Sequence, residues 1–193
     1  MFSLPDWAFY PLAAAVTGGM VAGALAFGDA TQRTPEQIRA EGMVYEGDTL
    51  NALTTGNGLE ASVLIEGDTA FQRITAARGP FDGMQSAGAF FALSPDELEA
   101  LQGHRIRLSF DVRAGGDQPA EGVRFNLFLP GIGQNGWTRY PVGEDFETVT
   151  FDISPPTCVW DHGYIGIWPD WDFERNTIDL RRVELTALEE IEC

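Results

Sequence analysis

The sequence contains no lysine: its 12 basic residues are all arginines, and they stand against 29 acidic residues. The formal net charge is therefore −17 at pH 7. A surface this acidic repels nucleic-acid phosphates and anionic lipid headgroups. The composition argues against nucleic acid as a partner. It leaves a solvated acidic face as the simplest interpretation of the charge, with a basic protein partner as the alternative.

Cysteine and histidine are also scarce, with two of each in 193 residues. Neither Cys158 nor Cys193 belongs to a C-x-x-C motif or lies near a histidine cluster, which argues against a metal centre and against thiol catalysis. The two cysteines can pair in one disulfide or remain free thiols. The signatures G-x-S-x-G and H-E-x-x-H and a phosphate-cradling glycine loop are missing, so we predict that the protein is not an enzyme.

Charged residues are absent from Trp7 to Phe27. As an α-helix this run would be about 30 Å long, the thickness of a bilayer core. The sequence therefore predicts a transmembrane anchor helix over residues 1–28, a connector over 29–42 and one domain over 43–193. The alternative is a cleaved signal peptide, but the stretch before the run lacks the positive charge that such a signal usually carries.

Small residues recur every four positions along this run, a spacing that lets a second helix approach closely. The pattern predicts helix packing, by self-association or within an integral membrane protein complex. The alternative is that alanine and glycine are simply common in such helices. We expect a bacterial-type inner membrane location with one pass and a periplasmic domain, although Arg33 and Arg39 favour the opposite side. The predicted helix-packing residues are Ala15, Gly18, Gly19, Ala22 and Gly23.

From Met43 onward, short runs of alternating apolar and polar residues are separated by glycine, asparagine, aspartate and proline. This pattern predicts an all-β fold, an antiparallel β-sandwich, with one short helix after Ser94. The Arg181-Arg182 pair interrupts the alternation of the last strand, which predicts a β-bulge. The predicted strands are Met43–Glu46, Leu59–Glu66, Ala70–Ala76, Ala87–Leu93, Arg105–Arg113, Val123–Leu129, Glu147–Ile153, Tyr164–Trp168 and Ile178–Ala187.

Four segments resemble a known type of domain: LEALQGHRIRLSFDVR from Leu98, FETVTFDI from Phe146, IGIWP from Ile165 and IDLRRVEL from Ile178. They are similar to the strand patterns of the jelly-roll domains of carbohydrate-binding modules and galactose-binding-like domains. The resemblance covers the C-terminal half of the chain and implies a jelly-roll sandwich. Its motifs are strand patterns rather than catalytic signatures, so it speaks to fold far more than to function.

The segment from Cys158 to Asn176 combines aromatic and polar residues at the highest density in the chain. Aromatic faces stack on sugar rings and carboxylates accept hydrogen bonds from hydroxyls, so this segment is the best candidate for a ligand or partner site. The glycine-rich loop from Gly131 to Gly143 could add two aromatic rings. The alternative for Trp160 and Trp168 is a core position. The predicted binding residues are Trp137, Tyr140, Trp160, Asp161, His162, Trp168, Asp170, Trp171 and Asp172.

No cofactor is predicted, and a structural calcium ion is the weaker alternative at Asp170, Asp172, Glu174 and Asn176. Two functions are favoured. The first is a non-catalytic, single-pass membrane-anchored subunit whose helix packs into a membrane protein complex and whose β-sandwich contacts partners on the aqueous side. The alternative is a membrane-anchored carbohydrate-binding module that grips a cell-envelope glycan. A glycoside hydrolase is a third and weaker possibility.

Overall fold

The structure is a computed structural model, and it describes residues 6–29, 33–82, 86–131, 136–172 and 174–192. The chain divides into two compact units, Met1–Thr34 and Pro35–Cys193, which are described separately. The predicted boundaries of anchor, connector and domain stay a prediction.

The first unit contains the α-helix α1, Asp6–Asp29. Within the residues that the structure describes, no helix is long and apolar enough to cross a membrane. The prediction of a transmembrane helix is therefore not supported. The helix-packing role of the small residues stays a prediction, and within this first unit no described atom, apart from the helix's own backbone and the adjacent residues, lies within 4 Å of a Cβ built at Gly18, Gly19 or Gly23.

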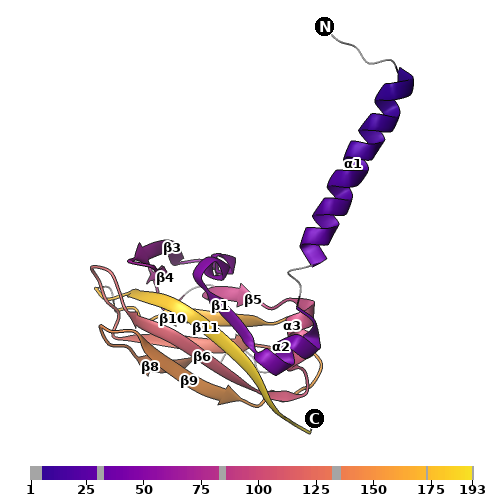
Figure 1. The fold of residues 1–193 in the computed structure, drawn as a ribbon. Helices are drawn as coiled ribbons and strands as arrows, with labels where there is room; N and C mark the ends of the chain where they lie inside the picture. The colour runs from indigo at the N-terminus through magenta and orange to yellow at the C-terminus, as the bar shows by residue number, and fades with distance from the viewer. Residues whose placement is uncertain (1–5, 30–32, 83–85, 132–135, 173, 193) are drawn as a thin grey trace. The chain divides into compact units, whose positions relative to one another are not determined.

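The second unit is a sandwich of two antiparallel sheets (Figure 1). The six-stranded sheet has the order β3-β4-β11-β6-β9, and β1 also pairs with β11. Its strands are β1 (Met43–Glu46), β3 (Leu59–Glu66), β4 (Thr69–Ala76), β6 (His104–Ala114), β9 (Glu147–Ile153) and β11 (Thr177–Glu190). The five-stranded sheet has the order β2-β5-β10-β7-β8. Its strands are β2 (Thr54–Thr55), β5 (Ala89–Ala92), β7 (Gly122–Phe128), β8 (Thr138–Pro141) and β10 (Tyr164–Pro169).

Strand β11 holds the six-stranded sheet together. It pairs with β6 along most of its length, while Thr177–Leu180 also pairs with β4 and Arg182–Leu185 with β1. The register shifts between Leu180 and Arg182, so the predicted bulge is confirmed. The bulge lies where one neighbour of β11 gives way to the next.

The core lies between the two sheets and is built by the alternation that the sequence shows. In β6, Ile106, Leu108, Phe110 and Val112 are all buried, and the residues between them are more exposed. The ring of Phe110 stacks on Phe125 of β7 with 3.6 Å between the centroids. This stack joins the two sheets at the centre of the sandwich.

All nine predicted strands are present, with ends shifted by at most a few residues. Two strands and one short helix were not predicted. Strand β2 has only two residues, the 3₁₀ helix η1 spans Gly47–Ala52, and β8 lies inside the segment Gly131–Gly143 that was expected to be a loop. These elements are too short to show a periodic pattern, and β2 and β8 form through pairing with β5 and β7.

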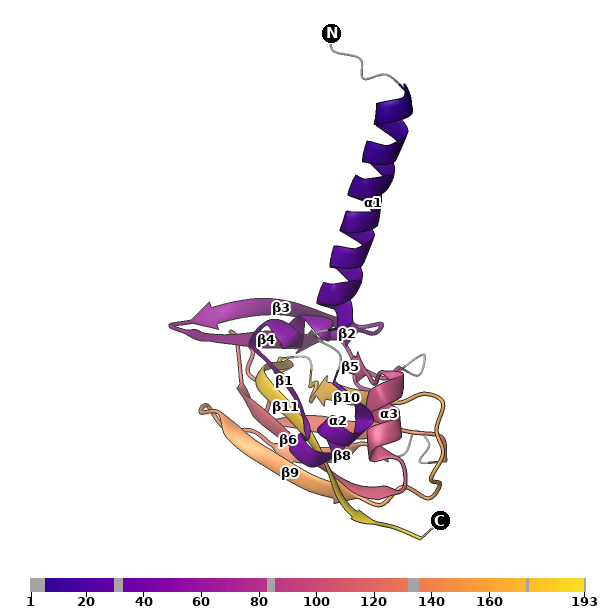
Figure 2. The ribbon, with the colours of Figure 1, turned by 45° about the vertical axis from the view of Figure 1, so that its right-hand side comes forward.

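Two short helices, α2 (Pro35–Glu41) and α3 (Pro95–Leu101), pack side by side on the sandwich (Figures 1 and 2). Arg39 of α2 donates a hydrogen bond from Nε to the carbonyl oxygen of Ala100, at 3.3 Å. The predicted start of α3 is confirmed: the Ser94 hydroxyl accepts from the backbone N–H of Glu97, and the Glu97 carboxylate accepts from the backbone N–H of Ser94. This is a capping box.

Replacing Ser94 by alanine is expected to lower the free energy of unfolding by about 1 kcal/mol, because the N–H of Glu97 loses its partner at the helix start. Urea denaturation measures this loss. Ser94→Asp is the matched control and should keep most of the stability, since aspartate caps equally well. Equal losses in both variants would contradict the capping role.

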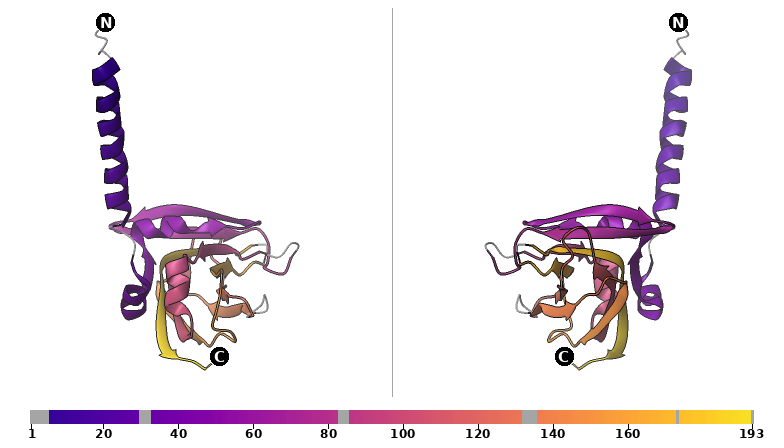
Figure 3. Two further views of the ribbon diagram at one scale, coloured as in Figure 1. Left: turned by 90° about the vertical axis from the view of Figure 1, so that its right-hand side faces the viewer. Right: turned by 90° about the vertical axis from the view of Figure 1, so that its left-hand side faces the viewer.

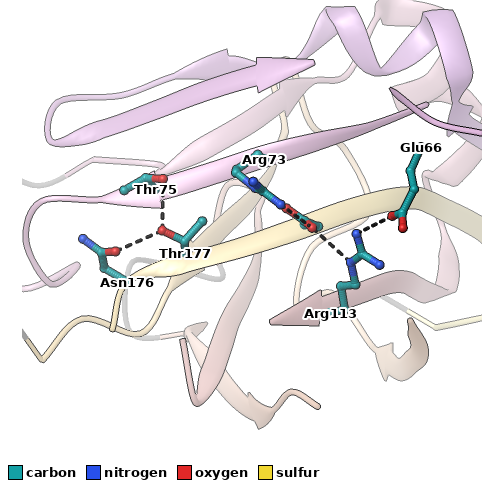
Figure 4. Close-up of polar contacts among 7 residues, drawn as sticks. Glu66, Arg73, Thr75, Arg113, Asn176 and Thr177 are labelled. Carbon is teal, nitrogen blue, oxygen red and sulfur yellow. Dashed lines mark hydrogen bonds and ion pairs between the residues drawn. The ribbon is translucent and has the colours of Figure 1, made fainter. Parts of the chain in front are cut away.

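The β3–β4 hairpin extends past the neighbouring strands (Figures 2 and 3). An ion-pair network ties it to the middle of the six-stranded sheet. Asp179 of β11 is fully buried and accepts from Arg73 of β4 at 2.7 and 3.0 Å and from Arg113 of β6 at 3.0 Å. Arg113 also contacts Glu66 of β3 at 2.7 Å. Figure 4 shows Arg73, Arg113 and Glu66 in this arrangement.

Candidate functional site

The five-stranded sheet has one face turned to the core and one turned away from it, which we call the outer face. On β7, Val123, Phe125 and Leu127 are buried in the core, so the intervening side chains belong to the outer face. Antiparallel pairing extends this assignment across the sheet, because paired residues point to the same side. The outer face thus carries Phe90 of β5, Tyr164, Gly166 and Trp168 of β10, Arg124, Asn126 and Phe128 of β7, and Arg139 of β8.

One end of the outer face is charged. Asp170, directly after β10, accepts a hydrogen bond from Nε of Arg124 at 3.0 Å and another from Nε of Arg139. Gly122 lies under this group, and a Cβ there would be 2.7 Å from Oδ2 of Asp170. The glycine therefore leaves the room in which the carboxylate bridges the two arginines.

A cleft of about 290 Å³ opens beside this charged group. Its wall includes two aromatic side chains, Trp171 and Phe81, and the Phe81 side chain is 68% exposed. Arg175 and Glu121 form an ion pair at the rim. The cleft thus combines ring faces with charged hydrogen-bonding groups. It is lined by Gly79, Pro80, Phe81, Asp82, Glu121, Arg124, Arg139, Asp170, Trp171, Asp172 and Arg175.

The alternating acidic residues after β10 do not converge as calcium ligands. Oδ1 of Asp172 accepts from the backbone N–H groups of Glu174 and Arg175, at 3.1 and 2.7 Å. Asn176 donates from Nδ2 to the carbonyl oxygen of Ala76. Among the residues with described positions, no group of three or more histidine, cysteine, aspartate or glutamate side chains could hold a metal ion. The calcium alternative therefore has no ligand cluster here.

Next to the charged end, the outer face becomes aromatic. The ring of Trp137 meets Phe128 and Trp168 edge to face, with centroids 5.4 and 6.0 Å apart. Trp168 is fully buried and donates from Nε1 to the carbonyl oxygen of Arg78, whose guanidinium lies 5.2 Å from the Trp168 ring centre. Trp168 is thus a packed base of the face, whereas Trp137 lies above it and is half-buried.

The structure separates the predicted binding residues. Asp170, Trp171 and Asp172 line the cleft together. Asp161 and His162 precede the six-residue strand β10, so they lie about 20 Å away at its other end. There the His162 ring hydrogen-bonds the Asp161 carboxylate at 2.5 Å, which lowers the pKa of Asp161.

The other two predicted aromatic residues pack inward. Trp160 is buried and donates from Nε1 to the carbonyl oxygen of Thr157. Tyr140 faces away from Trp137, toward Phe125 and Phe151 in the core, and burial raises the pKa of its phenol. Of the predicted aromatic residues, Trp171 therefore lines the cleft, and Trp137 lies on the outer face against Phe128 and Trp168.

Eight of the eleven cleft-lining residues were not predicted, among them Phe81, Arg124 and Arg139. Phe81 follows a Gly-Pro turn, and the two arginines lie on neighbouring strands far from Asp170 in sequence. The sequence signal for Arg124 was a charged residue between two apolar core positions, Val123 and Phe125. That signal marks an outward-facing residue but does not name its partner.

Cys158 is disulfide-bonded. The sequence has one other cysteine, Cys193, which lies outside the described residues.

Comparison with known proteins supports the fold. No protein-family model and no curated protein matches the sequence. Among solved structures, the CBM22-1 xylan-binding domain of Paenibacillus barcinonensis Xyn10C is similar over 77% of this chain and 95% of that domain, with 11% identity and a TM-score of 0.51. The CBM22-1–CBM22-2 tandem of the same protein matches over 78% of this chain and 46% of its own length, with 11% identity and a TM-score of 0.52.

The predicted jelly-roll β-sandwich of the carbohydrate-binding-module type is confirmed by these matches. They cover more of the chain than the C-terminal half on which the sequence resemblance rested. At this level of identity, the similarity establishes the fold alone.

Proposed function

We propose that the protein is a non-catalytic glycan-binding module that holds a neutral polysaccharide chain in the cleft beside Asp170. The observation that carries the proposal is the pairing of exposed aromatic walls, Trp171 and Phe81, with fixed polar groups in one open cleft. Aromatic faces pack against the C–H surfaces of sugar rings, and the polar groups orient the hydroxyls. The xylan-binding description of the similar domain supports a polysaccharide as ligand.

The polar groups of the cleft are pre-organised. Asp170 fixes the guanidinium groups of Arg124 and Arg139, and their remaining N–H groups can donate to sugar hydroxyls without reordering. The ordered arginines reduce the entropy lost on binding. The cleft lining has three arginines (Arg124, Arg139 and Arg175) against four carboxylates (Asp82, Glu121, Asp170 and Asp172), so its net charge is small, which suits an uncharged ligand.

Binding without turnover is part of the proposal. Hydrolysis of a glycosidic bond needs two carboxylates flanking the bond, one of them free to act as an acid. In the cleft, Asp170 is held by two arginines and Asp172 by two backbone N–H groups. These carboxylates act as fixed hydrogen-bond acceptors.

Replacing Trp171 by alanine should weaken binding of xylohexaose or of the best ligand on a glycan array by about 1–3 kcal/mol, because the ring face that packs on the sugar is lost. Isothermal titration calorimetry measures the change. Thermal melting of the variant checks that the domain remains folded, since Trp171 also packs partly against the core.

The matched control is Asp161→Asn, at the other end of β10, which should leave affinity unchanged. The absence of any glycan bound by the wild-type protein would overturn the proposed function. Equal affinity of the wild type and the Trp171 variant would overturn the placement of the ligand in this cleft.

The other function, a membrane-anchored subunit whose helix packs into a membrane complex, has less support. Among the described residues, no helix is long and apolar enough to cross a membrane. The inner-membrane location and periplasmic side stay predictions. The disulfide at Cys158 favours an oxidising compartment for this domain.

A further inference from the structure

Asn126, on the outer face of β7, is buried without a complete set of hydrogen bonds. Its exposed fraction is 1%, and its Nδ2 group has no hydrogen-bond partner among the described residues. A buried amide N–H₂ without an acceptor is unfavourable, so such groups are rare in folded proteins. Nδ2 of Asn126 is therefore a buried hydrogen-bond donor without an acceptor among the described residues.

The indole of Trp137 is what covers Asn126. Pairing of β7 with β8 ends at Phe125 and Thr138, so Trp137 is the next residue along, beside Asn126, and pairing of β7 with β10 places Gly166 on the other side of Asn126. Cη2 of Trp137 lies 3.0 Å from the position of a Cβ at Gly166, two strands away. The indole must therefore reach across β7, over Asn126, to contact β10.

The floor under the indole is made of glycine. Besides Gly166, Gly88 before β5 has a positive φ of 81°, and a Cβ there would lie 3.2 Å from Cη2 of Trp137. The rings of Phe128 and Trp168 contact the indole edge to face. Without Trp137, the outer face would hold a hollow bounded by Gly88, Gly166 and the carbonyl of Ala87, by the Phe128 and Trp168 rings, and by the amide donor of Asn126.

We propose that this hollow is a second sugar subsite, occupied by the protein's own indole, and that a glycan enters it by displacing Trp137 and accepting a hydrogen bond from Nδ2 of Asn126. The inference rests on the proposed function and extends it. The hollow lies beside the Arg124–Asp170–Arg139 group, because Arg124 pairs with Trp168. One polysaccharide chain can thus run from the cleft into the hollow.

The test compares the wild type with Trp137→Ala and with Trp137→Leu, a second variant that keeps more apolar volume. Titration calorimetry with xylohexaose and cellohexaose measures affinity. Both variants should bind at least threefold more tightly than the wild type, because no ring has to be displaced. Adding Asn126→Ala to Trp137→Ala should abolish the gain. Tyr140→Leu is the matched control, since it removes an aromatic ring from β8 on the core side, and it should give no gain.

Unchanged or weaker binding by both Trp137 variants would overturn the subsite, as would a gain that survives loss of Asn126. The proposed function has its own readout. If Trp171→Ala weakens binding and the Trp137 variants bind like the wild type, ligand binding in the cleft is supported and the second subsite is rejected. If only the Trp137 variants bind, the second subsite is supported and glycan binding by the wild-type protein is rejected. If neither the wild type nor any variant binds either hexasaccharide, the second subsite is rejected as well.

Discussion

Asp179→Asn is expected to lower the free energy of unfolding by about 3 kcal/mol. The substitution keeps the shape of the side chain and removes the one negative charge that Arg73 and Arg113 share. The two guanidinium groups would then repel each other beside a buried amide. Because water reaches part of both arginines, with 31% and 22% of their side chains exposed, we expect the lower end of the range for broken buried pairs.

Glu66→Gln provides the control in the same network. Glu66 contacts Arg113 from the outside and its side chain is 66% exposed, so its loss should lower stability by less than about 1 kcal/mol. Urea denaturation at neutral pH measures both variants. Similar losses for Glu66 and Asp179 would show that burial of Asp179 has no energetic role in attaching the β3–β4 hairpin.

Phe110→Ala should lower the free energy of unfolding by about 3–5 kcal/mol, because it removes a fully buried ring and leaves a cavity between the sheets. The cavity would lie beside Phe125, on which the Phe110 ring stacks, and near Phe151. Neither strand can move inward to fill it without breaking its pairing with its neighbours. Differential scanning calorimetry or urea denaturation detects the loss.

Phe81→Ala is the comparison, because it removes the same ring from an exposed position in the cleft. Its expected effect on stability is within about 0.5 kcal/mol. If both substitutions had the same effect, the Phe110–Phe125 stack would not be the centre of the core.

The elements that were predictable are those in which local pattern and burial agree. Strand β6 alternates over its whole length and is buried on one side, and the box at Ser94 fixes the start of α3. The bulge in β11 was predictable because the Arg181-Arg182 pair interrupts the alternation of that strand. Strand β8 could not be found, because glycines and a proline surround it and its pairing partner Gly122–Phe125 lies in a separate segment.

The candidate site was predictable only in part, for a related reason. Asp170, Trp171 and Asp172 are consecutive, so their density in the sequence revealed them. The two arginines that orient Asp170 come from β7 and β8, and only the sheet brings them together. The same density argument wrongly grouped His162 with Asp170, because it ignored that an extended strand separates the residues at its two ends.

The uncharged run from Trp7 to Phe27 was predicted to be helical, and it lies within α1. Its role as a membrane span has no support among the described residues.

The position of β11 has a consequence for biosynthesis. This strand lies between β4 and β6 and also pairs with β1, yet all three precede it along the chain. A nascent polypeptide on the ribosome can form the β3–β4 hairpin early. The place between β4 and β6 stays empty until residues 177–190, which form β11, emerge. This sheet therefore cannot be completed before β11 has emerged, and until then its exposed edges are natural binding sites for chaperones.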